Sequence, residues 1–171
     1  MVLAAGAATR FGSPKQRLFL PRVLDRVRAS VVDDVIVVLG AHDVDTDART
    51  VRAHHWEDGP GASLRAGLDA LGPEIEAAVI VLADGPDLSA ASIDRIVEAW
   101  RTDGSPVLAA SYGGVRGHPV LLAREVWATV PNEGARALEP RLVACDDLGS
   151  PGDVDTADDL STGRFDAPPA E

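Results

Sequence analysis

The sequence is poor in cysteine and in basic residues. Cys145 is the single cysteine, so the chain can form no internal disulfide and no cysteine-based zinc site, which fits the reducing cytosol. Lys and Arg number 16 against 27 Asp and Glu, which gives a net charge of -11. Because nucleic acids and anionic membranes are bound through basic surfaces, this balance argues against both as partners.

Long apolar runs are also lacking. No stretch reaches the roughly 20 residues that a membrane-spanning helix needs. The apolar start of the chain has no basic residue before it and is interrupted by Arg10, unlike a secretion signal. We therefore expect a cytoplasmic protein. With 46% apolar residues the chain can build a full core, and we expect one domain over residues 1–163 with a loose tail over residues 164–171.

Short apolar runs alternate along the chain with segments of helical periodicity. The expected strands are residues 2–5, 35–39, 50–53, 79–82, 107–112 and 142–144. The expected helices are residues 21–31, 61–71 and 89–100, with a short helix around Trp127. Continuous β-branched strands that alternate with helices indicate a sheet covered on both faces. The prediction is a three-layer, doubly wound, Rossmann-like α/β fold with a mostly parallel sheet.

In such a fold ligands bind beyond the carboxyl ends of the strands, so the residues that follow each strand are the candidate site. The first turn, residues 5–15, contains Gly6 and Gly12 together with Arg10 and Lys15. Its spacing is neither that of the dinucleotide fingerprint nor that of the P-loop. Small residues let backbone N–H groups approach a phosphate, which the two cations would also hold. The alternative is a surface loop with two solvated cations.

Carboxylates follow at two further places. Asp84 comes directly after the strand 79–82, where it would suit a magnesium ion bound to phosphates, although Asp is also common in turns that lead into helices. Four carboxylates cluster within residues 153–159. Asp153 or Asp155 would be a second metal ligand, or the cluster simply favours the start of a short helix.

The remaining polar candidates carry weaker signals. His118 lies between Gly117 and Pro119. We expect the segment 113–119 to be flexible and the histidine side chain to be accessible. His54 and His55 would point to opposite faces of a strand and lack a third ligand, so a zinc site is rejected. Ser63 opens a predicted helix, where its hydroxyl would hold a base or phosphate or merely cap the helix. There is no Gly-x-Ser-x-Gly elbow of a serine hydrolase, and Cys145 is expected to be packed.

Taken together, five segments resemble the MobA-like NTP transferases, most closely the molybdopterin cytidylyltransferase branch. They occur in the family's order and span almost the whole chain before the tail. The segments are Leu3-Ala4-Ala5-Gly6 with Arg10, Gly12, Pro14 and Lys15; residues 79–86; Gly117-His118-Pro119; Gly134-Ala135-Arg136; and Asp153-Val154-Asp155-Thr156.

The resemblance implies a nucleotidyltransferase fold and a set of roles. Nucleotide-binding residues would be Leu3, Ala4, Ala5, Gly6, Arg10 and Lys15, with Ser63 as a further contact. Asp84 would hold Mg²⁺, and Gly117 and His118 would lie beside the acceptor. Ala5 stands where the guanylyltransferase branch has a second glycine, which favours CTP over GTP.

The expected reaction is a magnesium-dependent transfer of CMP from CTP to a phosphorylated acceptor, molybdopterin, with release of pyrophosphate. Arg10, Lys15 and Asp84 would be its catalytic residues, acting through alignment and charge neutralisation. Two alternatives remain open. One is the same fold acting on another acceptor such as a sugar phosphate. The other is a non-catalytic nucleotide-binding partner in molybdoenzyme maturation.

Overall fold

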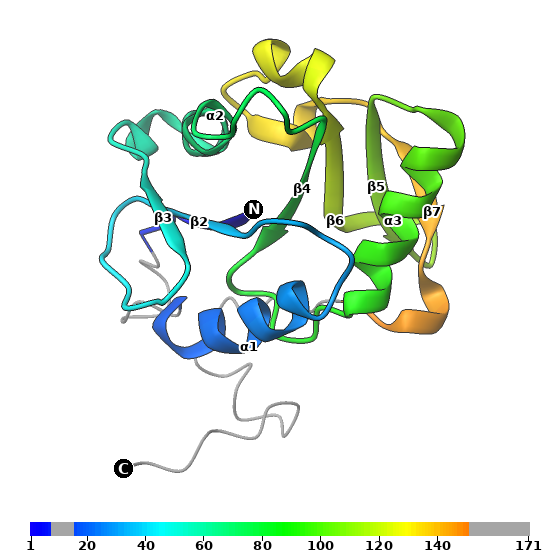
Figure 1. Cartoon of the computed structure of the whole chain (residues 1–171), viewed down its shortest axis with the longest axis horizontal. Helices are drawn as coiled ribbons and strands as arrows, with labels where there is room; N and C mark the ends of the chain where they lie inside the picture. Colours follow the sequence, from blue (N-terminus) through cyan, green and yellow to red (C-terminus); the bar gives the residue numbers. More distant parts are fainter. Residues whose placement is uncertain (8–15, 151–171) are drawn as a thin grey trace.

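A seven-stranded mixed sheet runs through the protein, for which the computed structural model describes residues 1–7 and 16–150. The strand order is β3-β2-β1-β4-β6-β5-β7 (Figure 1). All pairings are parallel except those of β6, which runs antiparallel to both β4 and β5. The strands are β1 (Val2–Ala4), β2 (Ile36–Leu39), β3 (Arg49–Arg52), β4 (Ala77–Leu82), β5 (Val107–Tyr112), β6 (Val115–Ala123) and β7 (Arg141–Ala144).

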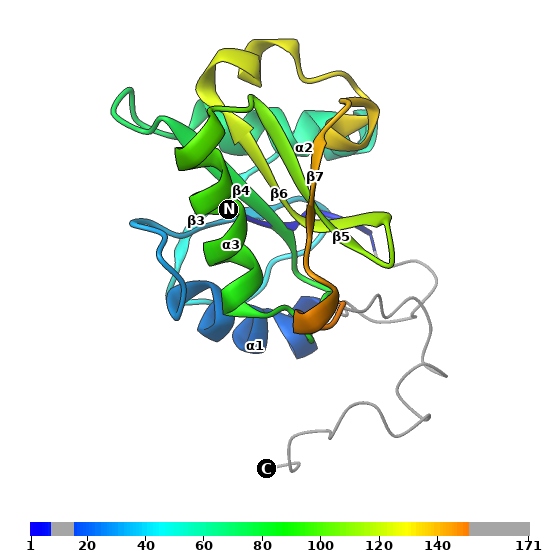
Figure 2. The same cartoon turned by 90° about the vertical axis from the view of Figure 1, so that its right-hand side faces the viewer.

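Helices cover both faces of this sheet. Helix α2 (Pro60–Asp69) lies on one side, and α1 (Gln16–Arg28) and α3 (Ala90–Asp103) lie on the other (Figures 1 and 2). Short 3-10 helices complete the described chain: η1 (Trp56–Asp58), η2 (Arg124–Thr129), η3 (Gly134–Ala137) and η4 (Asp146–Leu148). This arrangement confirms the predicted three-layer, mostly parallel α/β fold. In the described residues no helix is both long and apolar enough to cross a bilayer.

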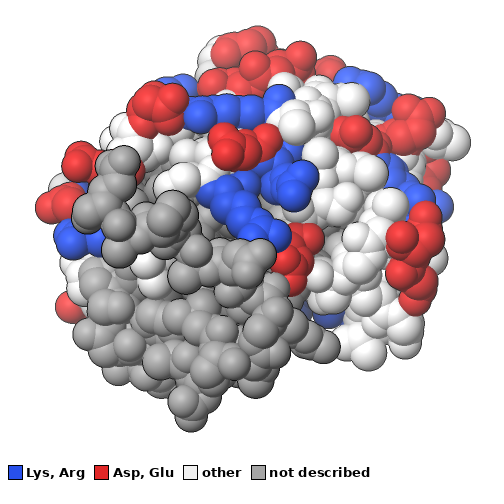
Figure 3. Space-filling view, turned by 90° about the horizontal axis from the view of Figure 1, so that it is seen from below, with Lys and Arg blue, Asp and Glu red and all other residues white. Residues whose placement is uncertain are grey.

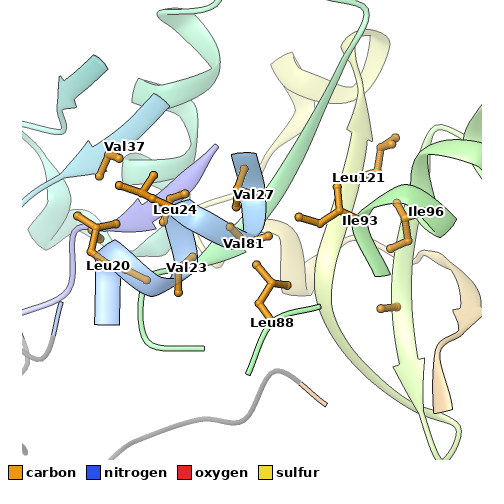
Figure 4. Packing of buried hydrophobic residues seen from close by; sticks show 14 of the residues in the cluster. Leu20, Val23, Leu24, Val27, Val37, Val81, Leu88, Ile93, Ile96 and Leu121 are labelled. Atoms are coloured by element: carbon orange, nitrogen blue, oxygen red, sulfur yellow. The ribbon is translucent and has the colours of Figure 1, made fainter. Parts of the chain in front are cut away.

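The apolar strands are buried on both faces because neighbouring side chains point to opposite layers. In β2, Val37 and Leu39 pack in the cluster formed with α1 and α3, whereas Ile36 and Val38 pack in the cluster formed with α2. Figure 4 shows the first cluster, in which side chains of α1 and α3 converge on the sheet. Fully burying one such side chain stabilises the fold by about 1.5–3 kcal/mol. The two clusters together therefore hold the strands in this order and keep the strand ends at a common edge of the sheet.

Most of the segment expected to be flexible instead belongs to β6, the longest of the described strands. Gly113 and Gly114 adopt positive φ angles of 61° and 76° in a tight turn, and β6 begins at the next residue. The expectation was wrong because the first half of β6 is polar and contains Pro119, which has no N–H for a ladder. The pairing of β5 with β6 shifts register between Ala109 and Ser111, and this irregularity accommodates the proline.

The first helix also differs from its predicted bounds. It begins at Gln16 rather than at Pro21, so the proline lies inside α1 and not in its first turn. The reason is the apolar stripe, which extends backwards to the fully buried Leu20. At the other end Val31 lies beyond the helix and is 46% exposed. The predicted tail, residues 164–171, lies outside the described residues.

Candidate functional site

Two of the predicted site segments are joined at the carboxyl edge of the sheet. Strands β1 and β4 are parallel neighbours, and the amide of Ala83 donates a 3.0 Å hydrogen bond to the carbonyl of Leu3. The turn that begins with Ala5 and Gly6 therefore starts beside Asp84, which is partly buried and follows Ala83 directly. In open α/β sheets this edge is where ligands bind.

The turn after β1 is also held from the β2 side. The amide of Ala41 donates to the Ala5 carbonyl at 3.2 Å. Gly40 makes this approach possible, because a Cβ at that position would lie 2.5 Å from the Ala5 oxygen and 2.8 Å from the Ala5 Cβ. Gly6 itself is exposed at this edge.

Ser63 lies in the opening turn of α2, which begins at the same edge. Helix α2 follows the parallel strand β3, and its later residue Gly67 packs against Met1 at the opposite end of β1. The N-cap of α2 is Gly59, so Ser63 does not cap the helix. Its side chain is 5% exposed, and its hydroxyl has no hydrogen-bond partner among the residues the structure describes. Because a buried hydroxyl without a partner is costly, this position favours a ligand contact.

His118 lies next to the strand that carries Asp84. Ile80 of β4 pairs with Val120 of β6, so the antiparallel register brings His118 opposite Leu82. A cavity of about 330 Å³ is found here. Its lining includes Leu82, Gly85, Tyr112, Arg116, Gly117 and His118.

The His118 side chain is partly buried, which contradicts the expected accessible loop histidine. Burial lowers its pKa to about 4, the positive charge of Arg116 acts in the same direction, and the negative charge of Asp84 opposes both. The imidazole is therefore neutral near pH 7. Its backbone carbonyl accepts a 2.8 Å hydrogen bond from the Tyr112 hydroxyl, which holds this part of β6 in place. Burial raises the pKa of Tyr112 to about 12, so the phenol stays protonated.

Arg116 was not among the predicted site residues, yet it organises this region. Its Nη1 donates to the carbonyls of Leu138 at 2.8 Å and Arg136 at 3.2 Å, and its Nη2 donates to the Ala135 carbonyl at 2.8 Å. Burial lowers the pKa of the guanidinium. The sequence marked Gly134-Ala135-Arg136 as one of the family segments. It did not show that Arg116, about twenty residues earlier in the chain, binds carbonyls of this segment, because a local pattern does not report contacts between residues so far apart.

Residues just before that segment hold the start of α2. Gly61 donates its amide to the Asn132 carbonyl at 2.9 Å. Arg65 donates to the carbonyl of Val130 and to the side chain of Asn132, each at 2.9 Å. Residues 130–138 thus connect β6, which lines the cavity, with the helix turn that holds Ser63.

The predicted site divides into a described and an undescribed part. The described part lies at one edge of the sheet. It comprises the carboxyl ends of β1 and β4, the opening turn of α2 and the amino-terminal half of the antiparallel strand β6, with the residues Leu3, Ala4, Ala5, Gly6, Asp84, Ser63, Gly117 and His118. Arg10, Lys15, Asp153 and Asp155 lie outside the described residues. Within the described chain no three His, Cys, Asp or Glu side chains are grouped as a metal site. A single carboxylate is nonetheless a fitting ligand for Mg²⁺, which commonly takes one or two carboxylates and completes its shell with substrate phosphates and water.

Charges on another face of the molecule are mixed. Seen from below, arginines are interspersed with acidic side chains over the described surface (Figure 3). Arg22 pairs with Asp87 at 3.3 Å and Arg95 with Asp147 at 2.6 Å. Such exposed pairs contribute little to stability, and they break up the positive charge that nucleic-acid binding requires.

The strand order and the helices on both faces of the sheet define a Rossmann-like α/β protein with a candidate site at the carboxyl edge. Residues 1–141 match the family model of the MobA-like NTP transferase domain. The chain belongs to this family, which confirms the resemblance found in the sequence. Comparison with curated proteins gives no match.

Solved structures agree over nearly the full length. Rv0371c from Mycobacterium tuberculosis H37Rv is 29% identical with a TM-score of 0.75, and the alignment covers 94% of each chain. Its homologue from Mycobacterium sp. strain JC1 is 26% identical with a TM-score of 0.77, covering 94% of this chain and 91% of that one. A manganese complex of Rv0371c is 28% identical with a TM-score of 0.69, again covering 94% of each.

Proposed function

We propose that this protein transfers CMP from CTP to a phosphorylated acceptor, molybdopterin, and releases pyrophosphate in a magnesium-dependent reaction. The observation that carries the proposal is the hydrogen bond from Ala83 to Leu3, which joins the glycine turn of β1 to the strand end bearing Asp84. A triphosphate over that turn would lie next to the carboxylate. Membership of the MobA-like NTP transferase family supports the reaction class.

In the proposed reaction an oxygen of the acceptor phosphate attacks the α-phosphorus of CTP, a P–O bond to the acceptor forms, and the bond to pyrophosphate breaks. A phosphate monoester is already ionised near pH 7, so no strong general base is needed. The backbone of residues 3–6, with Arg10 and Lys15, would hold the triphosphate and balance the charge on the leaving pyrophosphate. Ser63, whose hydroxyl has no partner among the described residues, would donate it to the nucleotide.

Asp84 would hold Mg²⁺, with Asp153 or Asp155 as a second ligand. The ion would neutralise phosphate charge as it develops in the transition state. The manganese complex of Rv0371c shows a divalent cation bound by a similar protein and supports this assignment.

The acceptor would occupy the cavity beside His118. The neutral imidazole of His118 and the neutral phenol of Tyr112 can form hydrogen bonds with an acceptor there, and neither group adds a charge to the cavity. Gly117 leaves room against Tyr112, since a Cβ at this position would lie 3.0 Å from the ring. The cavity also has the apolar side chains of Leu82 and Leu88. This mixture suits a flat, partly polar acceptor such as a pterin.

The test is a pyrophosphate-release assay with CTP or GTP, with and without molybdopterin, in the presence and absence of Mg²⁺. We expect release that requires CTP, the acceptor and the metal together. Release with a sugar phosphate but not with molybdopterin would reassign the acceptor. Nucleotide binding without release with any acceptor would favour the non-catalytic partner.

Variants test the roles. Asp84→Asn and Lys15→Ala should each lower kcat about a hundredfold, as expected for loss of one contact made in the transition state. The matched control is Asp87→Asn. It removes a carboxylate that lies in the same loop as Asp84 but pairs with Arg22 at the surface. Near-normal turnover in both Asp84→Asn and Lys15→Ala would refute the assignment.

A further inference from the structure

The opening turn of α2 is capped by a loop that is distant in sequence. Pro60 has no N–H, and the amide of Gly61 donates to the Asn132 carbonyl at 2.9 Å. The two backbones approach closely here, because a Cβ on Gly61 would overlap the Pro131 carbonyl oxygen and lie 2.8 Å from the Asn132 Cα. The first N–H groups of a helix are its usual anion-binding groups. In this helix the N–H of Gly61 is already taken by the loop.

Arg65 ties the same turn to the loop a second time. Its Nη1 donates to the Val130 carbonyl and its Nη2 donates to the Asn132 Oδ1 atom, each at 2.9 Å. A guanidinium is planar and rigid, so two such bonds from one group set both the distance and the tilt between the turn and the loop. Asn132 therefore meets α2 through its main chain and through its side chain.

Ser63 lies between these two attachments. It is on the same face of α2 as Gly67, whose position for a Cβ is 2.5 Å from the Met1 sulfur and 2.7 Å from a Val38 methyl group. Ser63 lies one helical turn before Gly67 and is therefore closer to the carboxyl edge of the sheet. A hydroxyl bond of about 2.8 Å is lost when the donor moves away by about 1 Å. Because the serine side chain is short, any contact that it makes depends on where the backbone of the turn lies.

We propose that Arg65 is a positioning residue that holds the first turn of α2 against residues 130–132 and so places the Ser63 hydroxyl for its contact with the nucleotide. The inference rests on the proposed function, because it assumes that CTP binds at this edge. The guanidinium of Arg65 is engaged by two acceptors of the loop. It acts on the nucleotide through the backbone of one helical turn.

A double-mutant cycle separates this role from general stabilisation of the fold. Arg65→Met keeps an unbranched side chain and removes both donors, whereas Ser63→Ala removes the hydroxyl. We expect Ser63→Ala to raise the KM for CTP about tenfold, the effect of one lost hydrogen bond, and Arg65→Met to raise it about fivefold to tenfold. The double variant should show no increase beyond that of Ser63→Ala, because the hydroxyl that Arg65 positions is then absent. A lost contact of uniform binding leaves kcat unchanged, so kcat should stay within about twofold.

The loop side of the contact is tested at Asn132. Asn132→Asp keeps an oxygen for Nη2 and should leave the KM for CTP within about twofold, whereas Asn132→Ala removes it and should raise KM about threefold. The matched control is Arg124→Met. Arg124 is also partly buried and also donates to two carbonyls, those of Gly72 and Ile75, but it lies at the amino edge of the sheet. This control should lower the melting temperature without changing the KM for CTP.

The measurements are CTP binding by calorimetry with Mg²⁺, KM and kcat from pyrophosphate release, and the melting temperature of every variant. An unchanged KM in Arg65→Met or Ser63→Ala, an equal increase in Arg124→Met, or a full additional increase in the double variant would overturn the inference while leaving the proposed function intact. If Arg65→Met does not fold, the cycle is completed with Asn132→Ala, which removes only the Nη2 contact. An unsubstituted protein that binds no NTP would refute the proposed function first, and with it this role.

Discussion

The close approach of Gly40 to Ala5 can be tested by adding one methyl group. In Gly40→Ala the new Cβ would start 2.5 Å from the Ala5 oxygen and 2.9 Å from its Cα, distances that real Cβ atoms do not adopt. Both positions are buried, and the obstacle is backbone, so the turn after β1 has to move. Overpacking of this kind costs about 1–3 kcal/mol. Alanine also restricts the unfolded chain, which offsets about 0.4–1 kcal/mol of that cost.

Taking the middle of each range, the net loss of stability is about 1.3 kcal/mol. For a chain of this size each kcal/mol lowers Tm by about 2–4 °C, so we expect a decrease of about 3–5 °C by calorimetry. Because the displaced group is the start of the glycine turn, the KM for CTP should rise as well. The control is Gly72→Ala, where the atoms nearest to the added Cβ belong to the flexible carboxylate of Glu74 and not to backbone.

The result that would refute this reasoning is a Tm for Gly40→Ala within a degree of both the unsubstituted protein and Gly72→Ala. An unchanged KM together with a lowered Tm would mean that the turn absorbs the shift without affecting the nucleotide. The packing argument would then stand, but the link from β2 to the site would not.

Two further predictions concern β6. Because burial lowers the pKa of His118 to about 4 while the unfolded chain binds its proton near pH 6.5, the contribution of His118 to stability is lost as pH falls from about 6.5 to 4. Urea denaturation should show a smaller acid loss for His118→Gln, and an equal loss in both proteins would contradict the assignment. Arg116→Ala removes the donors of three carbonyls and should cost about 2–3 kcal/mol, with faster amide hydrogen exchange in residues 132–138. Unchanged exchange there would show that Arg116 does not hold η3.

Much of the fold follows from local patterns. The strand predicted over residues 107–112 is β5 (Val107–Tyr112), and the strong apolar run at residues 79–82 is the second half of β4. These strands are buried on both faces, so their continuous apolar composition alone predicts them as strands. Family membership could be found in the same way, because short segments at strand ends keep their order along the chain.

Other features could not be read from the sequence. Strand β6 was missed because its first half is polar and pairs only with β5 across the Gly113-Gly114 turn, while its apolar second half pairs with β4, which is distant in sequence. His118 looked accessible between glycine and proline, but it is partly buried because the antiparallel pairing of β6 with β4 places it opposite Leu82. The local pattern of apolar and polar residues does not reveal which strands lie next to each other in the sheet.

The sequence by itself determined the alternation of strands and helices, the glycine turn and the carboxylate after β4, since each depends on residues adjacent in the chain. The tertiary structure alone decided that Leu3 and Ala83 are bonded and that Arg116 holds η3. Those contacts join residues 19 to 80 positions apart, and they exist only because packing on both faces of the sheet fixes which strands lie side by side.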